Sequence, residues 1–484
     1  MRILLINPPV PNNKNWIREG RCQQIDIWGA PFPPMSLALI STSLVQHNHE
    51  TLIIDAGPES KTIDDVIQTA KIFKPDFIIL TTVTATISTD LDWFCKTIKS
   101  HFQKIQIAAV GVHVSALPEE TLQSFPDLDF AIIGEPELTC QELADNLKSK
   151  KFDSITGLAF RNEDSKITTN SPRSFNDTID DFGFPDWEKI NFKNYLMPII
   201  GKPFSMIHFA RGCPYKCEYC TAHTYNGRSY RMHSVEHVIA EIKFNMSLGV
   251  CDFLFWTELL TFDSKYLNSI LDQLIETGLN KKIRWVCNSR VDTVTADILK
   301  KMKLAGCWQI AFGFEFGTDE MLFKVQKGGK ASVDLAKKSA KLAADAGLVV
   351  DGHFMLGYPG ENKDQIEKTI ELSLSLPLTF SHFYSVVPYP GAQIYSDWVM
   401  KSGGTQNSIH KKIDWKNFDQ RKPVHYKDGL HPDEIKKMQL LAYRKFYLRP
   451  IIVFKVLKIA ENITQFLNLI KSFFQVTKHL IFEK

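Results

Sequence analysis

Three closely spaced cysteines constrain this 484-residue chain more than any other feature. Cys213, Cys217 and Cys220 lie within eight residues of one another, directly after the apolar run 204–210. Thiolates are the protein ligands of [4Fe-4S] clusters, and this segment offers three of the four that a fully coordinated cluster needs. The spacing therefore predicts a cluster in which one iron has no protein ligand.

Two other uses of these cysteines fit the spacing less well. A structural zinc site usually takes four ligands from two separated pairs, and disulfide frameworks are typical of small secreted chains. The other six of the nine cysteines are scattered along the chain, as buried cysteines that act as small apolar residues often are. Zinc and plain structural cysteines remain the alternatives.

The cysteine spacing, with Tyr219 just before the last cysteine, resembles the signature of the radical S-adenosylmethionine (SAM) enzymes. The resemblance implies that the amino and carboxylate groups of SAM chelate the open iron. It also implies that an electron from the cluster cleaves SAM to methionine and a 5'-deoxyadenosyl radical. An external one-electron donor of the flavodoxin or ferredoxin type would supply that electron.

The first 147 residues alternate between strand and helix patterns, which favours a parallel sheet. Strands are expected at 2–7, 50–55, 76–82, 105–111 and 129–134, and helices at 36–46, 63–73, 89–102, 119–125 and 136–147. This pattern predicts a five-stranded Rossmann-like (flavodoxin-like) α/β domain with its ligand crevice at the carboxyl ends of the strands. The first turn lacks a glycine-rich phosphate-binding motif, which argues against a dinucleotide or nucleoside triphosphate.

Placed before a radical SAM signature, this domain resembles the cobalamin (B12)-binding domain of the B12-dependent radical SAM class. Segments 29–34, 111–118 and 134–137 carry the resemblance. It implies cobalamin contacts from the strand ends, at Asn7, Thr82, Gly111, His113 and Glu135. The Asp-x-His-x-x-Gly motif that supplies a histidine to cobalt in many B12 proteins is absent, so we expect no protein histidine on cobalt. An empty crevice is the alternative, because a fold does not specify a ligand.

Residues 148–200 are expected to connect two domains. Strand-like segments 155–161 and 166–169 flank a polar turn, which predicts a hairpin. The polar run 170–185, which contains proline, then marks a boundary.

Residues 201–402 repeat the strand–helix alternation six times. Strands are expected at 204–210, 251–256, 283–288, 309–315, 349–356 and 379–387, and helices at 235–248, 264–277, 296–305, 332–346 and 363–376. Six such units match the partial (β/α)6 barrel of the radical SAM fold. In barrels of this kind the C-terminal ends of the strands carry the chemistry.

Polar residues at these strand ends are the candidates for binding SAM. The resemblance implies that Glu258 lies near the amino group of SAM, and that Asn288 and Arg290 contact its hydroxyl and carboxylate groups. Glu315 lies in segment 313–317, which resembles the family's Gly-Ile-Glu-Ser-Gly turn with Phe316 in place of serine. A role as a cap or turn former is the alternative for each of them.

No residue is assigned a catalytic role. His353 and His382 lie in the fifth and sixth expected barrel strands, where they could line a substrate chamber. A histidine in an apolar strand is more often a hydrogen-bonded core residue.

The last region, 403–484, is expected to be helical. From 449 to 482 polar residues recur every three or four positions between Ile, Leu, Val and Phe, which predicts an amphipathic helix with a wide apolar face. Such a helix would lie on a membrane surface or pack on the barrel. The chain opens without a signal-peptide pattern and lacks an apolar run long enough to span a bilayer, so we expect a cytoplasmic protein with possible peripheral membrane contact. The formal net charge of +3 gives no indication of nucleic-acid binding.

The domain order and the tail resemble most the subgroup that includes anaerobic tetrapyrrole cyclases and lipid-modifying enzymes of hopanoids or isoprenoids. The resemblance implies an enzyme that uses a [4Fe-4S] cluster, SAM and cobalamin to methylate or otherwise modify an unactivated carbon of a hydrophobic small molecule. Two alternatives stay open. One is a radical SAM enzyme without functional cobalamin, similar to methylthiotransferases, and the other is a non-catalytic Fe-S or corrinoid-binding protein.

Overall fold

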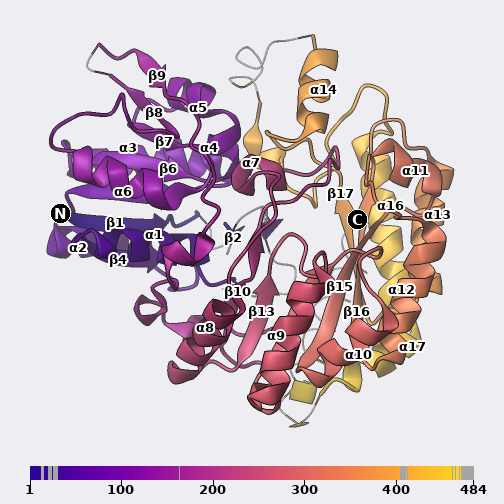
Figure 1. The fold of residues 1–484 in the computed structure, drawn as a ribbon. Coiled ribbons are helices and arrows are strands. Elements are labelled where there is room, and N and C mark those ends of the chain that lie inside the picture. Colours follow the sequence, from indigo (N-terminus) through magenta and orange to yellow (C-terminus); the bar gives the residue numbers. More distant parts are fainter. Residues whose placement is uncertain are drawn as a thin grey trace.

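A computed structural model describes residues 1–11, 16–19, 24–25, 31–162, 164–403, 410, 413–460, 462–463, 465–467 and 469. Two α/β lobes lie side by side, and the C-terminal helices cover the outer side of the second lobe (Figure 1). Cys22, part of the expected 29–34 loop and the end of the expected tail helix lie outside the described residues.

The first lobe is built on a sheet with the strand order β4-β1-β5-β6-β7-β8-β9. Its five parallel strands have the flavodoxin-like order that the sequence predicted. The sheet has seven strands rather than five, because the hairpin expected in the connector pairs antiparallel with the last parallel strand. The strands are β1 (Arg2–Asn7), β4 (Glu50–Asp55), β5 (Phe77–Thr81), β6 (Gln106–Val110), β7 (Phe130–Ile132), β8 (Leu158–Arg161) and β9 (Ile167–Thr169).

Helices cover both faces of this sheet because its central strands are apolar on both sides. Along β1, Ile3 and Leu5 pack in one core cluster, and Leu4 and Ile6 pack in another. Helices α1 (Met35–Gln46) and α6 (Pro136–Asn146) cover the first face. Helices α2 (Ile63–Phe73), α3 (Cys95–His101) and α5 (Pro118–Ser124) cover the second. The expected helix 89–102 begins as a π-helical turn at Thr89–Phe94, and the expected turn at 111–118 contains the short helix α4 (Val112–Ala116).

The second lobe is an open barrel of six parallel strands in sequence order, as predicted. The strands are β10 (Phe204–His208), β13 (Asp252–Trp256), β14 (Arg284–Ser289), β15 (Cys307–Glu315), β16 (Val349–Leu356) and β17 (Phe380–Ser385). The helices are α7 (Ala222–Asn226), α8 (Val235–Ser247), α9 (Ser264–Glu276), α10 (Ala296–Leu304), α11 (Asp319–Lys324), α12 (Val333–Asp345), α13 (Lys363–Ser375) and α14 (Gln393–Lys401). Two short antiparallel pairs complete the described strands, namely β2 (Trp16–Ile17) with β3 (Gln24–Ile25) and β11 (Ala210–Arg211) with β12 (Arg231–Met232).

Helix α16 (Pro432–Tyr447) covers the free edge of β17 and satisfies its backbone. The Tyr447 hydroxyl accepts from the Ser381 amide at 3.1 Å and donates to the Ser381 carbonyl at 3.0 Å. One turn earlier, the Tyr443 hydroxyl accepts from the Phe383 amide at 3.1 Å, and Gln439 donates to the Phe383 carbonyl at 2.6 Å. Side chains four residues apart on α16 thus replace the missing neighbouring strand.

The described part of the tail packs across the floor of the barrel. Helix α17 (Pro450–Leu457) buries Ile452 and Val456 in the main core cluster. Lys455 Nζ donates to the Leu378 carbonyl at 2.9 Å, next to β17, and Gln465 donates to a carbonyl just before β10 at 3.2 Å. The expected continuous helix is interrupted at 458–460. In the described part of the chain no helix is both long and apolar enough to cross a membrane.

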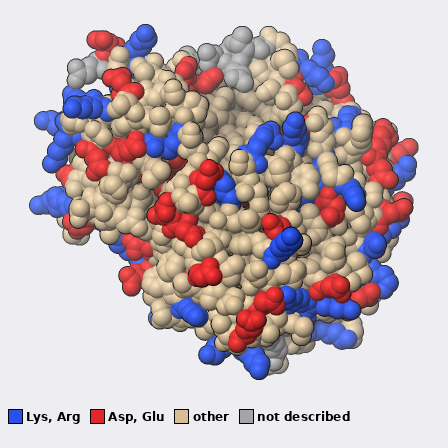
Figure 2. All heavy atoms as spheres, in the orientation of Figure 1, with Lys and Arg blue, Asp and Glu red and all other residues tan. Residues whose placement is uncertain are grey.

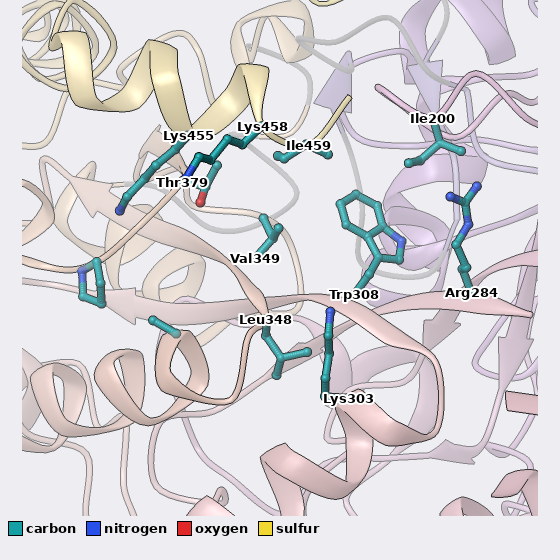
Figure 3. A pocket seen from close by; sticks show the side chains of 12 residues that line it. Ile200, Arg284, Lys303, Trp308, Leu348, Val349, Thr379, Lys455, Lys458 and Ile459 are labelled. Atoms are coloured by element: carbon teal, nitrogen blue, oxygen red, sulfur yellow. The ribbon is translucent and has the colours of Figure 1, made fainter. Parts of the chain in front are cut away.

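A cavity of about 510 Å³ remains between α17 and the starts of the barrel strands. Lys455 and Lys458 enter it from α17 and the turn that follows, and Arg284 and Trp308 face them across the cavity (Figure 3). The tail therefore acts as the floor of the barrel.

Candidate functional site

The three cysteines lie in the loop that connects β11 to α7, at the carboxyl end of β10. Cys213 is buried, and Cys217 and Cys220 are half-buried. The Cys213 amide donates to the Gly227 carbonyl at 3.2 Å, which fastens the start of the loop. Gly212 has φ 91°, and a Cβ there would lie 2.0 Å from the Ser229 carbonyl oxygen, so this turn accepts only glycine.

The arrangement of the thiols fits a cluster better than a single ion. The three cysteines are not among the groups of described residues whose ligand atoms all lie within 4.8 Å of one another. A single zinc ion needs its ligands on one small tetrahedron, whereas each thiolate of a four-iron cube binds a different iron. We therefore expect these thiols to hold the cluster.

Two cations lie near Cys217, namely Lys327 from the loop that follows α11 and Arg290 from the end of β14. The Cys217 thiol donates to the Lys327 carbonyl at 3.6 Å, and Arg290 Nη1 donates to the same carbonyl at 3.0 Å. The Arg290 guanidinium also pairs with Asp292 at 2.8 Å and stacks 3.8 Å above the Tyr215 ring. Burial raises the pKa of the Cys217 thiol, and the charges of Lys327 and Arg290 oppose that rise. These cations favour the anionic charge that bound thiolates carry.

Glu315 lies at the end of β15 in a strained backbone conformation. Its φ is 67°, and β15 shifts register against β16 between Gly313 and Glu315. The carboxylate pairs with buried Lys327 Nζ at 2.7 Å. Strain of this kind concentrates at functional sites, which agrees with a role for Glu315 near the cluster.

Glu258 follows β13 and retains an unsatisfied oxygen. Its Oε1 accepts from Asn226 at 2.7 Å, and its Oε2 is buried without a hydrogen-bond partner. The next residue, Leu259, packs with Cys213. A buried carboxylate oxygen that lacks a donor is costly, so this position fits an ammonium group such as that of SAM.

The other expected SAM residues differ in their surroundings. Asn288 is half-buried in β14, whereas the guanidinium of Arg290 is already engaged by Asp292 and backbone carbonyls. Glu361, in the turn after β16, accepts from the amides of Gly357 and Tyr358 and holds that turn. Burial raises the pKa of Glu361 to about 7.

In the first lobe, the expected cobalamin residues lie at the strand ends but are largely engaged with protein. Asn7 donates to Asp55 at 3.1 Å, and Tyr195 of the connector donates to the other Asp55 oxygen at 2.7 Å. Burial raises the pKa of Asp55 to about 6. Thr82 donates to Asp90 at 2.9 Å. The Asp55 and Asp90 carboxylates at this edge of the sheet are thus occupied by hydrogen bonds within the protein.

Gly111 and His113 lie at the end of β6. A Cβ on Gly111 would lie 2.2 Å from the Thr82 carbonyl oxygen, so this close approach of two strands needs glycine. His113 is fully buried, with Nδ1 3.3 Å from the Thr84 hydroxyl and Nε2 3.2 Å from His410. Burial holds the pKa of His113 well below its usual range. With both nitrogens engaged, His113 is poorly placed to bind cobalt, and the absence of a cobalt-bound histidine stays a prediction.

Glu135 faces the second lobe. Both of its oxygens accept from Arg231, at 2.6 and 3.0 Å, and Arg211 lies 3.4 Å away. Arg211 also pairs with Glu137 at 2.7 Å, and all four side chains are buried. These ion pairs join the first lobe to the two strands β11 and β12 that carry the cysteine loop.

A cavity of about 270 Å³ opens beside the cluster loop between the lobes. Its lining includes Ala116 and Leu117 from the first lobe, and Cys217 and Glu218 from the cysteine loop. On the face in Figure 2, uncharged residues predominate between the lobes, and cationic and anionic side chains are interspersed elsewhere.

Sequence reasoning missed Lys327, Tyr195 and the arginines that hold the lobes together. Lys327 lies in the glycine-rich segment after α11 rather than at a strand end. Tyr195 lies in the connector, which offered no motif. Arg211 lies two residues before Cys213, and a cation so close to the cysteine signature was the one available signal.

Comparison with known proteins agrees with this architecture. The chain matches the B12 binding domain over residues 28–144 and the radical SAM superfamily over residues 207–373. It is 29% identical over 459 residues, 94% of both chains, to an uncharacterized methyltransferase of Pyrococcus horikoshii. It is 23% identical over 458 residues, 93% of this chain and 71% of the other, to the anaerobic magnesium-protoporphyrin IX monomethyl ester cyclase of Cereibacter sphaeroides.

Two of the solved structures that share the fold cover most of this chain. One is the radical SAM methyltransferase TsrM of Kitasatospora setae with cobalamin and a [4Fe-4S] cluster, with TM-score 0.67, 14% identity, and 84% and 75% of the two chains covered. The other is the cobalamin-dependent SAM radical enzyme OxsB, with TM-score 0.67, 16% identity, and 100% and 73% covered. With both family models matched in this order, the chain belongs to the radical SAM enzymes that carry an N-terminal B12-binding domain, and its cofactors are a [4Fe-4S] cluster, SAM and cobalamin.

Proposed function

We propose that this enzyme transfers a methyl group to an unactivated carbon of a hydrophobic small molecule. The cavity between the lobes carries the proposal, because it brings the cysteine loop and the first lobe to one space. The relative that matches 94% of this chain is named a methyltransferase. Ring closure on a tetrapyrrole is the second candidate, favoured by the name of the Cereibacter relative.

Each of the expected site residues would have its own role in binding the cluster and SAM. Cys213, Cys217 and Cys220 would hold the cluster, and Glu258 would receive the SAM ammonium on its unpaired oxygen. Asn288 would contact a hydroxyl or carboxylate of SAM, and the Lys327–Glu315 pair would hold the loop against the cluster. When bound, the cluster and SAM supply radical chemistry, and cobalamin supplies a methyl carrier.

We also propose cobalamin contacts at Asn7, Thr82, Gly111, His113 and Glu135, through the backbone and the crevice that these residues shape. The side chains of Asn7, Thr82, His113 and Glu135 are engaged with other protein groups. The domain boundaries at 147, 200 and 402 remain our proposal, with hairpin β8–β9 joined to the first sheet.

Two partners complete the proposal. A flavodoxin or ferredoxin would reduce the cluster. The exposed face of α17 would contact an anionic membrane. Its side chains Ile451 and Phe454 are 54% and 55% exposed, and the Lys458 ammonium lies over the Phe454 ring. A row of this kind suits a bilayer interface, and it would hold the enzyme near a hydrophobic substrate.

The products of SAM test the reaction class. Reconstituted protein would be incubated anaerobically with SAM, cobalamin, a reductant and hydrophobic candidate substrates. Methyl transfer predicts S-adenosylhomocysteine together with 5'-deoxyadenosine and a product heavier by one methylene group. Formation of 5'-deoxyadenosine alone, with a product of unchanged carbon number, would favour cyclisation.

A further inference from the structure

A second group of ligand-type side chains lies inside the barrel, on its last two strands. Asp351 and His353 belong to β16, and His382 belongs to β17, directly opposite His353 in the parallel register. Their neighbours Phe354 and Phe383 point the other way, into the core beneath the helices. Because side chains alternate along a strand, the three polar side chains face the barrel interior.

The ligand atoms of these three residues converge on one point. Asp351 Oδ2 lies 3.3 Å from His382 Nε2 and 3.9 Å from His353 Nε2, and all three ligand atoms lie within 4.8 Å of one another. Charge-assisted hydrogen bonds are shorter, at about 2.7–2.9 Å. Two ligands on a tetrahedral ion with bonds of about 2.1 Å are separated by roughly 3.4 Å. The spacing is thus closer to that of ligands around an ion.

The carboxylate offers further evidence. Asp351 is buried, and its Oδ1 has no hydrogen-bond partner among the described residues. Gln309 Nε2 donates to Oδ2 at 3.3 Å, and exchange of the amide nitrogen and oxygen would direct an oxygen to the same point. An anionic oxygen, two imidazoles and an adjacent amide make a mixed N/O donor set.

We propose that Asp351, His353 and His382 bind one divalent transition-metal ion of the Zn²⁺ class inside the barrel, separate from the cysteine cluster. Two histidines and one carboxylate suit such ions and leave coordination positions open. The His353 side chain is 33% exposed, so the open positions face the space around it. The ion would bind an oxygen donor of a small molecule in that space.

The chain holds a matched control. Asp180, His233 and His237 also gather within 4.8 Å, but Asp180 accepts from His233 at 2.7 Å and from the Ser234 amide at 3.1 Å. The two imidazoles stack with centroids 4.3 Å apart. Hydrogen bonding and helix capping explain this cluster, so it should bind no ion.

Zinc binding to the full chain tests the proposal. Cluster-reconstituted protein would be dialysed anaerobically against buffered Zn²⁺, and bound zinc measured by mass spectrometry. We expect one zinc per chain in the wild type and in Asp180→Asn. Asp351→Asn and His382→Gln should bind at least about tenfold more weakly, because even outer-shell changes cost that much. Zinc-edge X-ray absorption should show nitrogen and oxygen neighbours with imidazole scattering.

Three results would overturn the proposal: no zinc in the wild type, equal zinc in Asp351→Asn, or sulfur among the neighbours of zinc. If Asp351→Asn fails to retain the cluster chromophore, His353→Gln provides the same comparison with a less buried side chain. Zinc should also raise the melting temperature of the wild type and not that of the variant, since it binds only the folded state.

Discussion

Glu258 and Glu361 both follow barrel strands, but their surroundings give them different roles. Glu361 is satisfied by two backbone amides, whereas Glu258 keeps one buried oxygen without a donor. The sequence placed Glu258 at a strand end but left its role open between a ligand and a turn former, because a residue's position in the chain does not show its hydrogen-bond partners. Lys327 shows the same limit, because its proximity to Cys217 depends on how the segment after α11 folds back.

Changing Glu258 to Gln should weaken SAM binding by about tenfold or more, since hydrogen bonds to charged groups contribute about 1.5–3 kcal/mol. The cluster absorbance should not change. Equilibrium dialysis with labelled SAM measures the effect, and Glu276→Gln, an exposed change at the end of α9, serves as the control. If Glu258→Gln binds SAM with wild-type affinity, the Glu258 carboxylate does not contact SAM.

Glu241 makes stability depend on pH. It is 2% exposed in α8, and burial raises its pKa to about 8. Because the folded state binds this proton more tightly than the unfolded chain, the contribution of Glu241 is complete below about pH 4.5 and is lost as pH rises through about 8. Glu241→Gln should therefore stabilise the protein more at pH 9 than at pH 6.

Urea unfolding at the two pH values measures this difference. The exposed Glu236→Gln on the same helix should show none. An equal effect of Glu241→Gln at both pH values would mean that the carboxyl is ionised in the folded protein.

At the scale of elements, the barrel and the first sheet were predictable from the spacing of apolar residues. Helices and strands that bury one or both faces show this spacing strongly in the sequence. The hairpin β8–β9 was predicted as an element, but its antiparallel pairing with β7, in which Phe160 lies opposite Phe130, joins segments about 30 residues apart and is not revealed by a local pattern. The sequence pattern did not predict the interruption of the tail helix at 458–460, because it goes with tertiary contacts. Lys455 before the interruption and Gln465 after it donate to carbonyls on different sides of the barrel.

The tyrosines of α16 should stabilise the barrel edge. Tyr443→Phe and Tyr447→Phe each remove a hydroxyl bonded to the backbone of β17. We expect each to lower the free energy of unfolding by about 0.5–1.5 kcal/mol, and more if a buried amide stays unsatisfied. Denaturant titration tests this, with Leu441→Ser on the exposed side of α16 as a near-neutral control. No change in either Tyr→Phe variant would mean that water replaces the hydroxyl.

Substitutions on the two faces of α17 should affect stability and membrane contact separately. Ile452→Ala removes a buried side chain and should cost about 2–5 kcal/mol. Phe454→Ser alters an exposed one and should leave stability nearly unchanged while reducing sedimentation with anionic liposomes. If wild-type protein stays in the supernatant, the outward face has no role at a membrane.

At the scale of the whole molecule, four buried side chains join the lobes. Arg231 pairs with Glu135, and Arg211 pairs with Glu137, across more than 70 positions of sequence. The sequence predicted both domains and their order but not these ion pairs, because the partners of a carboxylate at a strand end become apparent only when the second lobe is in place. The assignment of Glu135 to cobalamin stays a proposal.

Glu135→Gln should destabilise the protein by about 3–5 kcal/mol, because it leaves buried guanidinium charge without its partner. The variant should also retain less corrinoid, since the cavity between the lobes would lose its fixed geometry. Removing the exposed Lys341–Asp345 pair by Lys341→Ala should cost at most about 1 kcal/mol. Unchanged stability and unchanged corrinoid content in Glu135→Gln would show that the lobes are held by other contacts.

The central claim is that one chain holds an open-iron cluster and cobalamin at a shared cavity. The most direct measurement compares the wild type with the Cys213→Ala, Cys217→Ala, Cys220→Ala triple variant after anaerobic reconstitution with iron, sulfide and cobalamin, followed by desalting. The wild type should retain one cluster and one corrinoid per chain and convert SAM to 5'-deoxyadenosine, whereas the variant should keep the corrinoid and lose both the iron and SAM cleavage. Unaltered iron in the triple variant, or a wild type that retains no corrinoid, would contradict the claim.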